Sequence, residues 1–377
     1  MPRKKSGFIT FATMSKLLLL SVFILLGGFS TAFGQSEIIR NSAGFRWHGG
    51  FLFAHHQDMR HLATNHFNAW ELNYQRKFSG DKDWHHDYRL PSWGITALAM
   101  PVINQPIGAA FALFPYYYLP LTNGGRLNLN LKIGAGFGYL TESFNHIENH
   151  KNIAISTKSN IALQLGLDLR VQLFPRIEWN NGIFITHFSN GAVRMPNLGL
   201  NFLTVSSGIT YRFGPVEEQR YERKYFVRNP TISWSLFAGA GLKQSRVLQG
   251  NISPAFTLQI FGEKRLSRKF SLGAGAEFNY NSALPLAYQA KELVADNAAE
   301  LRGGLLIGSV FHFGDMEIIA QMGGYVLDPG LIDGRFFNRF GLRHKVSNRL
   351  KVNLTLRTHY AKADHFELGL VYRLSIL

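Results

Sequence analysis

The sequence predicts an all-β fold: a transmembrane antiparallel β-barrel of about sixteen strands, arranged in two sequence-related halves. Three features predict it: a leader typical of exported proteins, long stretches in which apolar and polar residues alternate, and connections that alternate between long and short. Backbone groups in lipid must all be hydrogen-bonded, which only helices and closed barrels achieve. No segment after the leader has the roughly 20 consecutive apolar residues of a transmembrane helix.

The N-terminal residues 1–34 resemble a signal peptide. A cationic start around Lys16 precedes the short apolar run 17–26, and small residues follow up to Gly34. These are the three parts of a secretory signal, and the apolar run is too short to cross a bilayer as a helix. We expect cleavage after Gly34, which would leave Gln35 as the mature N-terminus.

The alternation has a period of two residues and is clearest in three segments. Apolar side chains alternate with polar residues or glycine in 70–75, 127–133 and 163–172. Strands of soluble β-sandwiches usually run about five or six residues. Runs of about ten residues with one apolar face instead fit strands that cross a membrane.

The same pattern places the strands near residues 44–54, 66–78, 92–101, 106–119, 125–141, 158–173, 176–189, 198–213, 230–243, 252–264, 269–281, 298–313, 315–327, 335–345, 349–360 and 365–376. Long connections follow odd-numbered strands at 55–66, 142–157 and 282–297, and tight turns follow many even-numbered ones. The segment 79–91 departs from this rule, because it is long where a short turn is expected. An even number of strands would leave both termini in the periplasm.

A weak internal repeat divides the chain. The motif ITHFS at 185–189 is echoed by RTHYA at 357–361, and each is followed by a strand that ends in Tyr-Arg and an apolar residue. We therefore expect a first barrel half at 35–214, a charged periplasmic connection at 215–229 and a second barrel half at 230–377. The halves could form one large barrel or two eight-stranded units. We favour one barrel, because tandem closed barrels in one chain are rare.

The composition restricts the chemistry. The chain contains no cysteine, which excludes disulfides and thiol or zinc–thiolate sites. Its formal net charge of +16 suits an anionic partner such as a phosphorylated glycolipid, although a solvated basic rim would explain it equally well. Nucleic acid is not an expected partner, because the exported chain has no recognition module.

One predicted hairpin carries a candidate active site. His187 and Ser189 lie two residues apart on a strand, so both project from the lipid-facing side that includes Ile185. If the hairpin centres near Arg194, Asn201 of the next strand lies opposite His187. A histidine could then deprotonate Ser189 while a third side chain fixes its tautomer. A His-x-Ser pair also occurs by chance, so the pattern alone is compatible with a structural strand.

The hairpin resembles the lipid A 3-O-deacylase family, outer-membrane barrels that remove an ester-linked acyl chain from lipopolysaccharide. The resemblance covers the first eight strands and rests on His187-Phe188-Ser189-Asn190, on Pro196-Asn197 and on the strand end Tyr211-Arg212-Phe213. It implies Ser189 as nucleophile and His187 as general base. It also implies Asn197 as a contributor to the oxyanion site, with Asn190 in support.

Asn201 departs from the family pattern, which usually has a glutamate at this position. An asparagine oxygen can still accept a hydrogen bond from the imidazole N–H, as in Cys-His-Asn proteases. It supplies no negative charge to stabilise the imidazolium. We therefore expect slower turnover or a different orienting carboxylate.

The second half is expected to be a degenerate copy. Ala361 stands where Ser189 would be, so this half lacks the nucleophile. His359 lies on the polar face of its strand, and Glu367 faces inward from across the hairpin. We interpret them as an interior pair that satisfies buried charge.

Histidines gather in two further loops. The first outer loop contains His55, His56, His61 and His66 near Asp58, and the next loop contains His85, His86 and Asp87. Histidine is a common metal ligand, but these spacings match no defined site, so we expect solvated loop residues and no metal. The first cluster could alternatively bind lipid phosphate when protonated.

Together, the residues and the resemblance predict a carboxylic ester hydrolase of the cell outer membrane. It would remove an ester-linked acyl chain from lipid A by a Ser-His mechanism, without a cofactor, and its partners would be lipopolysaccharide and other outer-membrane lipids. The alternative is a non-enzymatic, porin-like or structural barrel that retains a decayed motif, because a sixteen-stranded barrel would enclose an aqueous channel.

Overall fold

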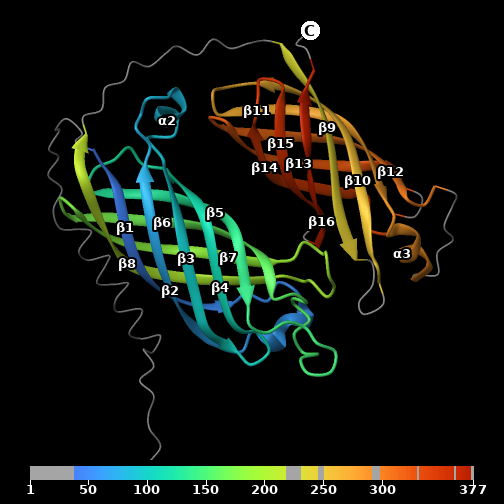
Figure 1. The fold of residues 1–377 in the computed structure, drawn as a ribbon, viewed down its shortest axis with the longest axis horizontal. Coiled ribbons are helices and arrows are strands. Elements are labelled where there is room, and N and C mark those ends of the chain that lie inside the picture. Colours follow the sequence, from blue (N-terminus) through green and yellow to red (C-terminus); the bar gives the residue numbers. More distant parts are fainter. Residues whose placement is uncertain are drawn as a thin grey trace, which may run out of the picture. The chain divides into compact units, whose positions relative to one another are not determined.

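The structure is a computed structural model, and it describes residues 38–217, 231–244, 250–290, 298–328, 331–360 and 362–374. Within these residues, sixteen strands form two closed antiparallel barrels of eight strands each (Figure 1). The expected signal peptide at 1–34, most of the expected connection at 215–229 and Ala361 lie outside the described residues.

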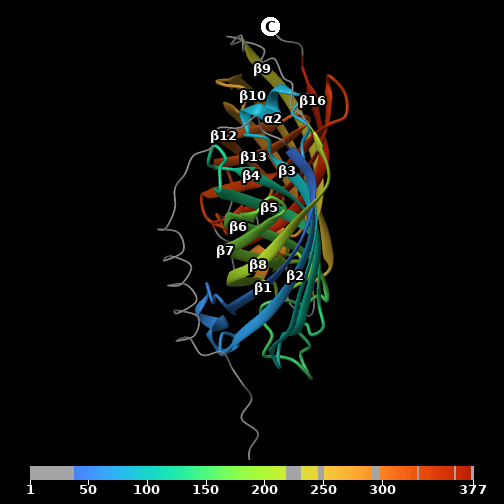
Figure 2. The same cartoon turned by 90° about the vertical axis from the view of Figure 1, so that its left-hand side faces the viewer.

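The first barrel closes between its first and last strands. Its strands are β1 (Ile38–Leu52), β2 (His66–Lys77), β3 (Ser92–Asn104), β4 (Gly108–Pro120), β5 (Leu127–Leu140), β6 (Ser159–Phe174), β7 (Ile177–Ser189) and β8 (Leu200–Glu217). β8 pairs with β7 on one side and with β1 on the other, from Ile38 opposite Glu217 to Leu52 opposite Phe202. Figure 2 shows β8, β1 and β2 lying side by side.

The second barrel repeats this closure. It consists of β9 (Ile232–Gln244), β10 (Ile252–Arg265), β11 (Phe270–Asn281), β12 (Leu301–Phe313), β13 (Met316–Leu327), β14 (Phe336–Lys345), β15 (Leu350–His359) and β16 (Lys362–Arg373). β16 pairs with β9 from Leu368 opposite Ala240 to Arg373 opposite Ser235. The sixteen strands and the two eight-stranded units are confirmed, whereas our preference for a single large barrel is wrong.

The reason for two barrels lies in the pairing partner of β8. Its 18 residues pair along most of β1, so the first eight strands have no free edge to offer to β9. The interior of an eight-stranded barrel is just wide enough for side chains to fill it. The described strands therefore do not form the sixteen-stranded channel on which the porin-like alternative depended.

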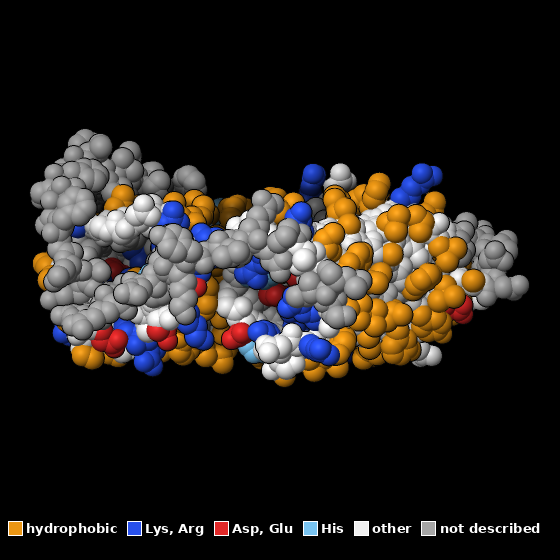
Figure 3. All heavy atoms as spheres, turned by 90° about the horizontal axis from the view of Figure 1, so that it is seen from above, with side chains coloured by type: hydrophobic (Ala, Val, Ile, Leu, Met, Phe, Trp, Pro, Cys, Tyr) orange, Lys and Arg blue, Asp and Glu red, His pale blue; other side chains and the backbone are white. Residues whose placement is uncertain are grey.

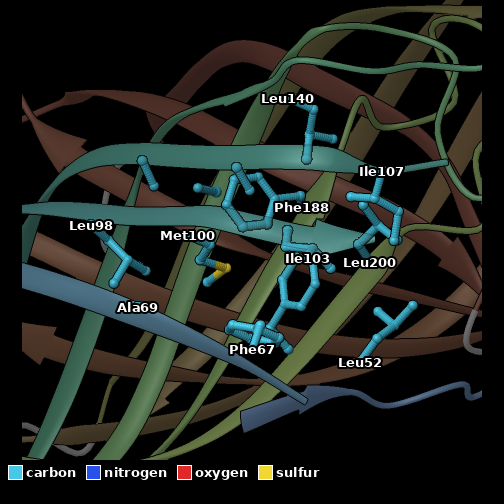
Figure 4. Packing of buried hydrophobic residues seen from close by; sticks show 14 of the residues in the cluster. Leu52, Phe67, Ala69, Leu98, Met100, Ile103, Ile107, Leu140, Phe188 and Leu200 are labelled. Carbon is cyan, nitrogen blue, oxygen red and sulfur yellow. The ribbon is translucent and has the colours of Figure 1, made fainter. Parts of the chain in front are cut away.

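The interior of the first barrel contains a polar layer and an apolar layer. In the polar layer Arg46 donates to both oxygens of Asp168, at 2.5 and 2.8 Å, and Lys132 Nζ lies 2.8 Å from Glu71. Such pairing offsets the cost of burying charge. The apolar layer lies toward the β1–β2 loop and is formed by residues such as Phe67, Phe188 and Leu200 (Figure 4).

The outer walls of both barrels are apolar. Alternate strand residues expose large hydrophobic side chains, among them Leu72, Leu113, Leu165 and Ile183 in the first barrel and Phe256, Leu258, Leu305 and Ile307 in the second. Figure 3 shows hydrophobic side chains covering the wall of the second barrel, in the right half of the view. An apolar outer face combined with a polar interior is the pattern of strands that cross a membrane.

Three short helices interrupt the described connections: η1 (Gln57–Leu62), α2 (Asp83–Asp87) and α3 (Leu284–Ala290). None of the helices in the described part of the chain has the length and hydropathy of a membrane-spanning helix.

The prediction of solvated loop histidines is wrong for one residue of the helix α2. The histidines of the first outer loop are exposed, as expected, but His85 is buried. Its ring stacks on Phe78 with 4.7 Å between ring centroids, and its Nδ1 accepts a hydrogen bond from the Gly80 N–H. His85 is therefore a packing residue of the 79–91 segment and not a solvated one.

The predicted pair of His359 with Glu367 in the second barrel is also wrong. Glu367 faces the interior, as expected, but lies opposite Thr355 on β15 and accepts from Arg339 Nε at 2.5 Å. His359 lies opposite Lys362, at the end of the strand, and its Nε2 is 2.7 Å from the Tyr325 hydroxyl. The register thus places the two side chains at different levels of the barrel.

Candidate active site

The hairpin of β7 and β8 brings the candidate residues to one place on the outer wall of the first barrel. His187 lies directly opposite Asn201, as the sequence predicted. Their neighbours Phe188 and Leu200 are fully buried on the inner face, so packing inside the barrel fixes the two strands that carry the site outside. Ile185, on the same face as His187, is exposed to the lipid side.

A chain of hydrogen bonds links His187 to a second histidine. His187 Nδ1 donates to Asn201 Oδ1 at 2.6 Å, and Asn201 Nδ2 donates to His55 Nδ1 at 2.9 Å. His55 Nε2 in turn lies 3.1 Å from the Leu198 carbonyl oxygen. Sequence reasoning missed His55 as a site residue. His55 can be found only from the pairing of β1 with β8. The Phe53 N–H extends this pairing, because it donates to the Asn201 carbonyl at 2.8 Å.

Ser189 is 4% exposed, and two donors converge on its hydroxyl oxygen. Asn197 Nδ2 donates to Ser189 Oγ at 3.0 Å, and the Gly191 backbone N–H donates to it at 3.1 Å. Within residues 38–217 His187 and Ser189 share a strand face but form no direct hydrogen bond. Catalytic hydrogen bonds often tighten only when substrate is bound.

Asn190 acts on the site through its neighbours. Its side-chain Nδ2 donates to Ser156 Oγ, Thr157 Oγ1 and the Arg194 carbonyl, at 3.2, 3.1 and 2.9 Å. Its backbone N–H donates to Asn197 Oδ1 at 3.2 Å, which turns Asn197 Nδ2 toward Ser189. Asn190 thus contacts Asn197, whose side chain in turn contacts the serine.

The β5–β6 loop, residues 141–158, packs against the hairpin tip. Ile155 forms a bridge with Asn197, and the Gly199 N–H donates to the Ala154 carbonyl at 2.9 Å. Gly199 has φ of +77°, and a Cβ added there would lie 2.6 Å from His187 Cε1. The sequence therefore needs glycine here both for the backbone conformation and for the space that the imidazole occupies.

An apolar surface adjoins the site. Leu163 of β6 lies opposite His187, and the pairs Leu165–Ile185 and Leu167–Ile183 continue along the wall. Ile183 is 59% exposed. A serine, a histidine and two hydrogen-bond donors thus lie at the end of an apolar strip.

A possible metal site lies elsewhere. Among the described residues, Asp333, His359 and Asp364 of the second barrel are close enough together to hold an ion. Their charges are already paired, because Arg302 Nη1 contacts Asp333 at 3.0 Å and Lys243 contacts Asp364.

The two barrels match two family models. Residues 68–210 match the model described as lipid A 3-O-deacylase (PagL), and residues 232–376 match the model described as acyloxyacyl hydrolase, C-terminal domain. Each match lies within one barrel, and together they span most of both. No curated protein matches the chain.

Solved structures with a similar course of the chain include three bacterial barrels. Neisserial surface protein A is 6% identical, with 47% of this chain and 99% of that chain covered and a TM-score of 0.33. The outer membrane enzyme PagL is 13% identical, with 44% and 97% covered and a TM-score of 0.32. A triple mutant of the Rhodopseudomonas blastica porin is 7% identical, with 89% and 100% covered and a TM-score of 0.19.

The resemblance seen in the sequence is thereby confirmed, because the matched segment of the first barrel contains His187, Ser189 and Asn201. The second barrel has its own match to the C-terminal domain of acyloxyacyl hydrolase. By the match of residues 68–210, the first barrel of this outer-membrane chain belongs to the lipid A 3-O-deacylase family.

Proposed function

We propose that the first barrel hydrolyses an ester-linked acyl chain of lipid A, with Ser189 as nucleophile and His187 as general base. The observation that supports this most is the convergence of Asn197 Nδ2 and the Gly191 N–H on Ser189 Oγ, beside His187 on the lipid-facing wall. Donors beside the serine could turn to the carbonyl oxygen of a bound ester, where negative charge develops during acyl transfer.

In the proposed reaction Ser189 Oγ attacks the ester carbonyl carbon while His187 Nε2 takes up the hydroxyl proton. Asn197 and the Gly191 N–H stabilise the oxyanion of the tetrahedral intermediate. The bond to the leaving alcohol oxygen then breaks, and His187 returns the proton to that oxygen. Water attacks the acyl-enzyme with the same assistance and releases a fatty acid and free Ser189. No cofactor enters the balance.

The position of the site suggests how substrate reaches it. Lipopolysaccharide diffuses laterally in the outer leaflet, so a site on the outer wall needs no passage through the barrel interior. The exposed side chains of Leu163, Leu165 and Ile185 would lie along the acyl chain. Because the acyl chain already lies in lipid, this strip would align it through van der Waals contacts and not through transfer from water.

Mass spectrometry of lipid A from expressing cells tests the proposal. The native chain should remove one acyl chain, and Ser189→Ala should leave lipid A intact. Ser159→Ala is the matched control, because Ser159 is an exposed serine at the start of β6. Intact lipid A with the native chain and both variants, all folded in the outer membrane, would instead favour a structural barrel with a decayed motif.

A further inference from the structure

We propose that His55 is a positioning residue for this hydrolysis: it orients the Asn201 amide and thereby fixes the His187 tautomer that can accept the serine proton. The inference rests on the proposed function. His55 precedes residue 68, where the match to the deacylase model begins, so the match does not assign it a role.

An asparagine at position 201 creates a problem that a carboxylate does not have. A carboxylate only accepts hydrogen bonds, so the imidazole beside it must carry its proton on Nδ1. An amide can also turn its Nδ2 toward the imidazole. His187 Nδ1 would then have to accept, its proton would move to Nε2, and Nε2 could no longer act as the base.

The contacts of His55 determine which atom of the Asn201 amide faces His187. The Leu198 carbonyl can only accept, so the proton of the neutral His55 ring lies on Nε2. His55 Nδ1 is then an acceptor, and Asn201 must turn its Nδ2 toward it. Asn201 Oδ1 is left facing His187, at 2.6 Å, and can bind only the Nδ1–H tautomer. The protonation of His187 is thus set from a backbone carbonyl through two side chains.

The fold holds His55 in place although the residue is exposed. The hydrogen bond from the Phe53 N–H to the Asn201 carbonyl ties the end of β1 to β8 two residues before His55. After His55, Met59 and Leu62 of η1 are buried in the apolar layer of the barrel. The loop is therefore fixed on both sides of the histidine.

Kinetics of the purified full chain on lipid A in detergent test the proposal. His55→Ala should lower kcat about fivefold, equal to about 1 kcal/mol, and leave KM within about twofold. His55→Asn should restore most of the rate, because its amide oxygen can accept in place of Nδ1. The matched control is His56→Ala, since the side chain of this neighbouring exposed histidine contacts Asp58.

The same substitution in an Asn201→Asp background distinguishes a loss of the Asn201 orientation from a general loss of structure. In Asn201→Asp both side-chain oxygens accept, so adding His55→Ala should no longer lower kcat. An equal loss in both backgrounds would mean that His55 only supports the loop, and this would overturn the proposal. So would an unchanged kcat for His55→Ala in the native background.

The His187 tautomer can also be measured without an activity assay. Nitrogen NMR shifts of His187 should show a protonated Nδ1 in the native chain and a shift of the proton toward Nε2 in His55→Ala. A His187 ring that keeps its Nδ1 proton in His55→Ala would contradict the inference. If Ser189→Ala retains activity, the proposed function fails instead, and the NMR result still decides the role of His55.

Discussion

Asn201 is the residue at which this chain departs from a triad with a carboxylate. Its oxygen satisfies the geometric part of the role, because it lies 2.6 Å from His187 Nδ1. It cannot stabilise the positive charge that His187 would acquire on taking the serine proton. In the proposed mechanism hydrogen bonds would orient His187, while Asn201 would add no charge to stabilise the imidazolium.

Asn201→Glu should raise kcat for lipid A deacylation about tenfold, since it adds that missing charge; a tenfold change equals about 1.4 kcal/mol. Initial rates of fatty-acid release by the purified protein provide the measurement. Asn201→Leu is the control that removes both orientation and charge, and it should be slower than the native chain. A glutamate variant no faster than native would argue against His187 as the general base.

Gly199→Ala should lower activity at least tenfold, because the added Cβ would lie 2.6 Å from His187 Cε1. Gly124→Ala is the matched control: its φ is +94°, close to the +77° of Gly199, and nothing lies within 4 Å of the added Cβ. Both variants bear the same kind of backbone cost, about 1–2 kcal/mol. Equal activities would show that the position of the His187 ring is unimportant.

The sequence predicted where His187, Ser189 and Asn201 lie on the hairpin, because strand alternation and hairpin register depend only on local spacing. It did not reveal His55. That residue reaches Asn201 only if β1 pairs with β8, and a single sixteen-stranded barrel would have separated them. The missed residue and the wrong barrel count thus have the same cause.

Among the elements, the hairpin tip and the 141–158 loop form one unit around Ser189. Asn190 connects them through two side-chain hydrogen bonds, to Ser156 and Thr157, and its N–H donates to Asn197. The strands of this unit were predictable from period-two alternation. The short helices η1, α2 and α3 within the loops were not, because such short segments carry too little periodicity.

Asn190→Ala should lower kcat about tenfold, since Asn197 would no longer be held toward Ser189 when the loop loosens. Activity assays should be paired with heat-modifiability on gels, which should show a native barrel. Asn128→Ala serves as control, because its side chain donates to the Gly125 carbonyl in a turn between β4 and β5. Native-like kcat for Asn190→Ala would mean that Asn197 does not depend on the loop.

The described strands form two barrels, and each barrel completes its own hydrogen bonding between strands. Alternation cannot distinguish this arrangement from one large barrel, because each strand has the same apolar and polar faces in both. The two arrangements differ in the strand with which β8 pairs, and the alternation pattern does not show which strand that is. Each barrel has its own buried ion network; in the second, Arg339 contacts Glu277 at 2.7 Å and Glu367 at 2.5 Å.

Arg339→Leu should destabilise the second barrel by about 3–5 kcal/mol, because it leaves buried carboxylates with too few cations. Hydrogen exchange followed by peptide mass spectrometry in denaturant should show earlier loss of protection in β9–β16 and an unchanged first barrel. Arg335→Leu, at an exposed arginine, should change neither barrel. Simultaneous loss of protection in both barrels would contradict their separate closure.

The proposed mechanism requires that an acyl group is transferred to Ser189 on the outer wall of the first barrel. The most direct measurement is to react the purified full chain with lipid A, quench with acid and determine the masses of its peptides. We expect the peptide containing Ser189 to become heavier by one acyl group, and we expect no such adduct in Ser189→Ala. Release of fatty acid without an adduct on Ser189, or with one on another residue, would contradict it.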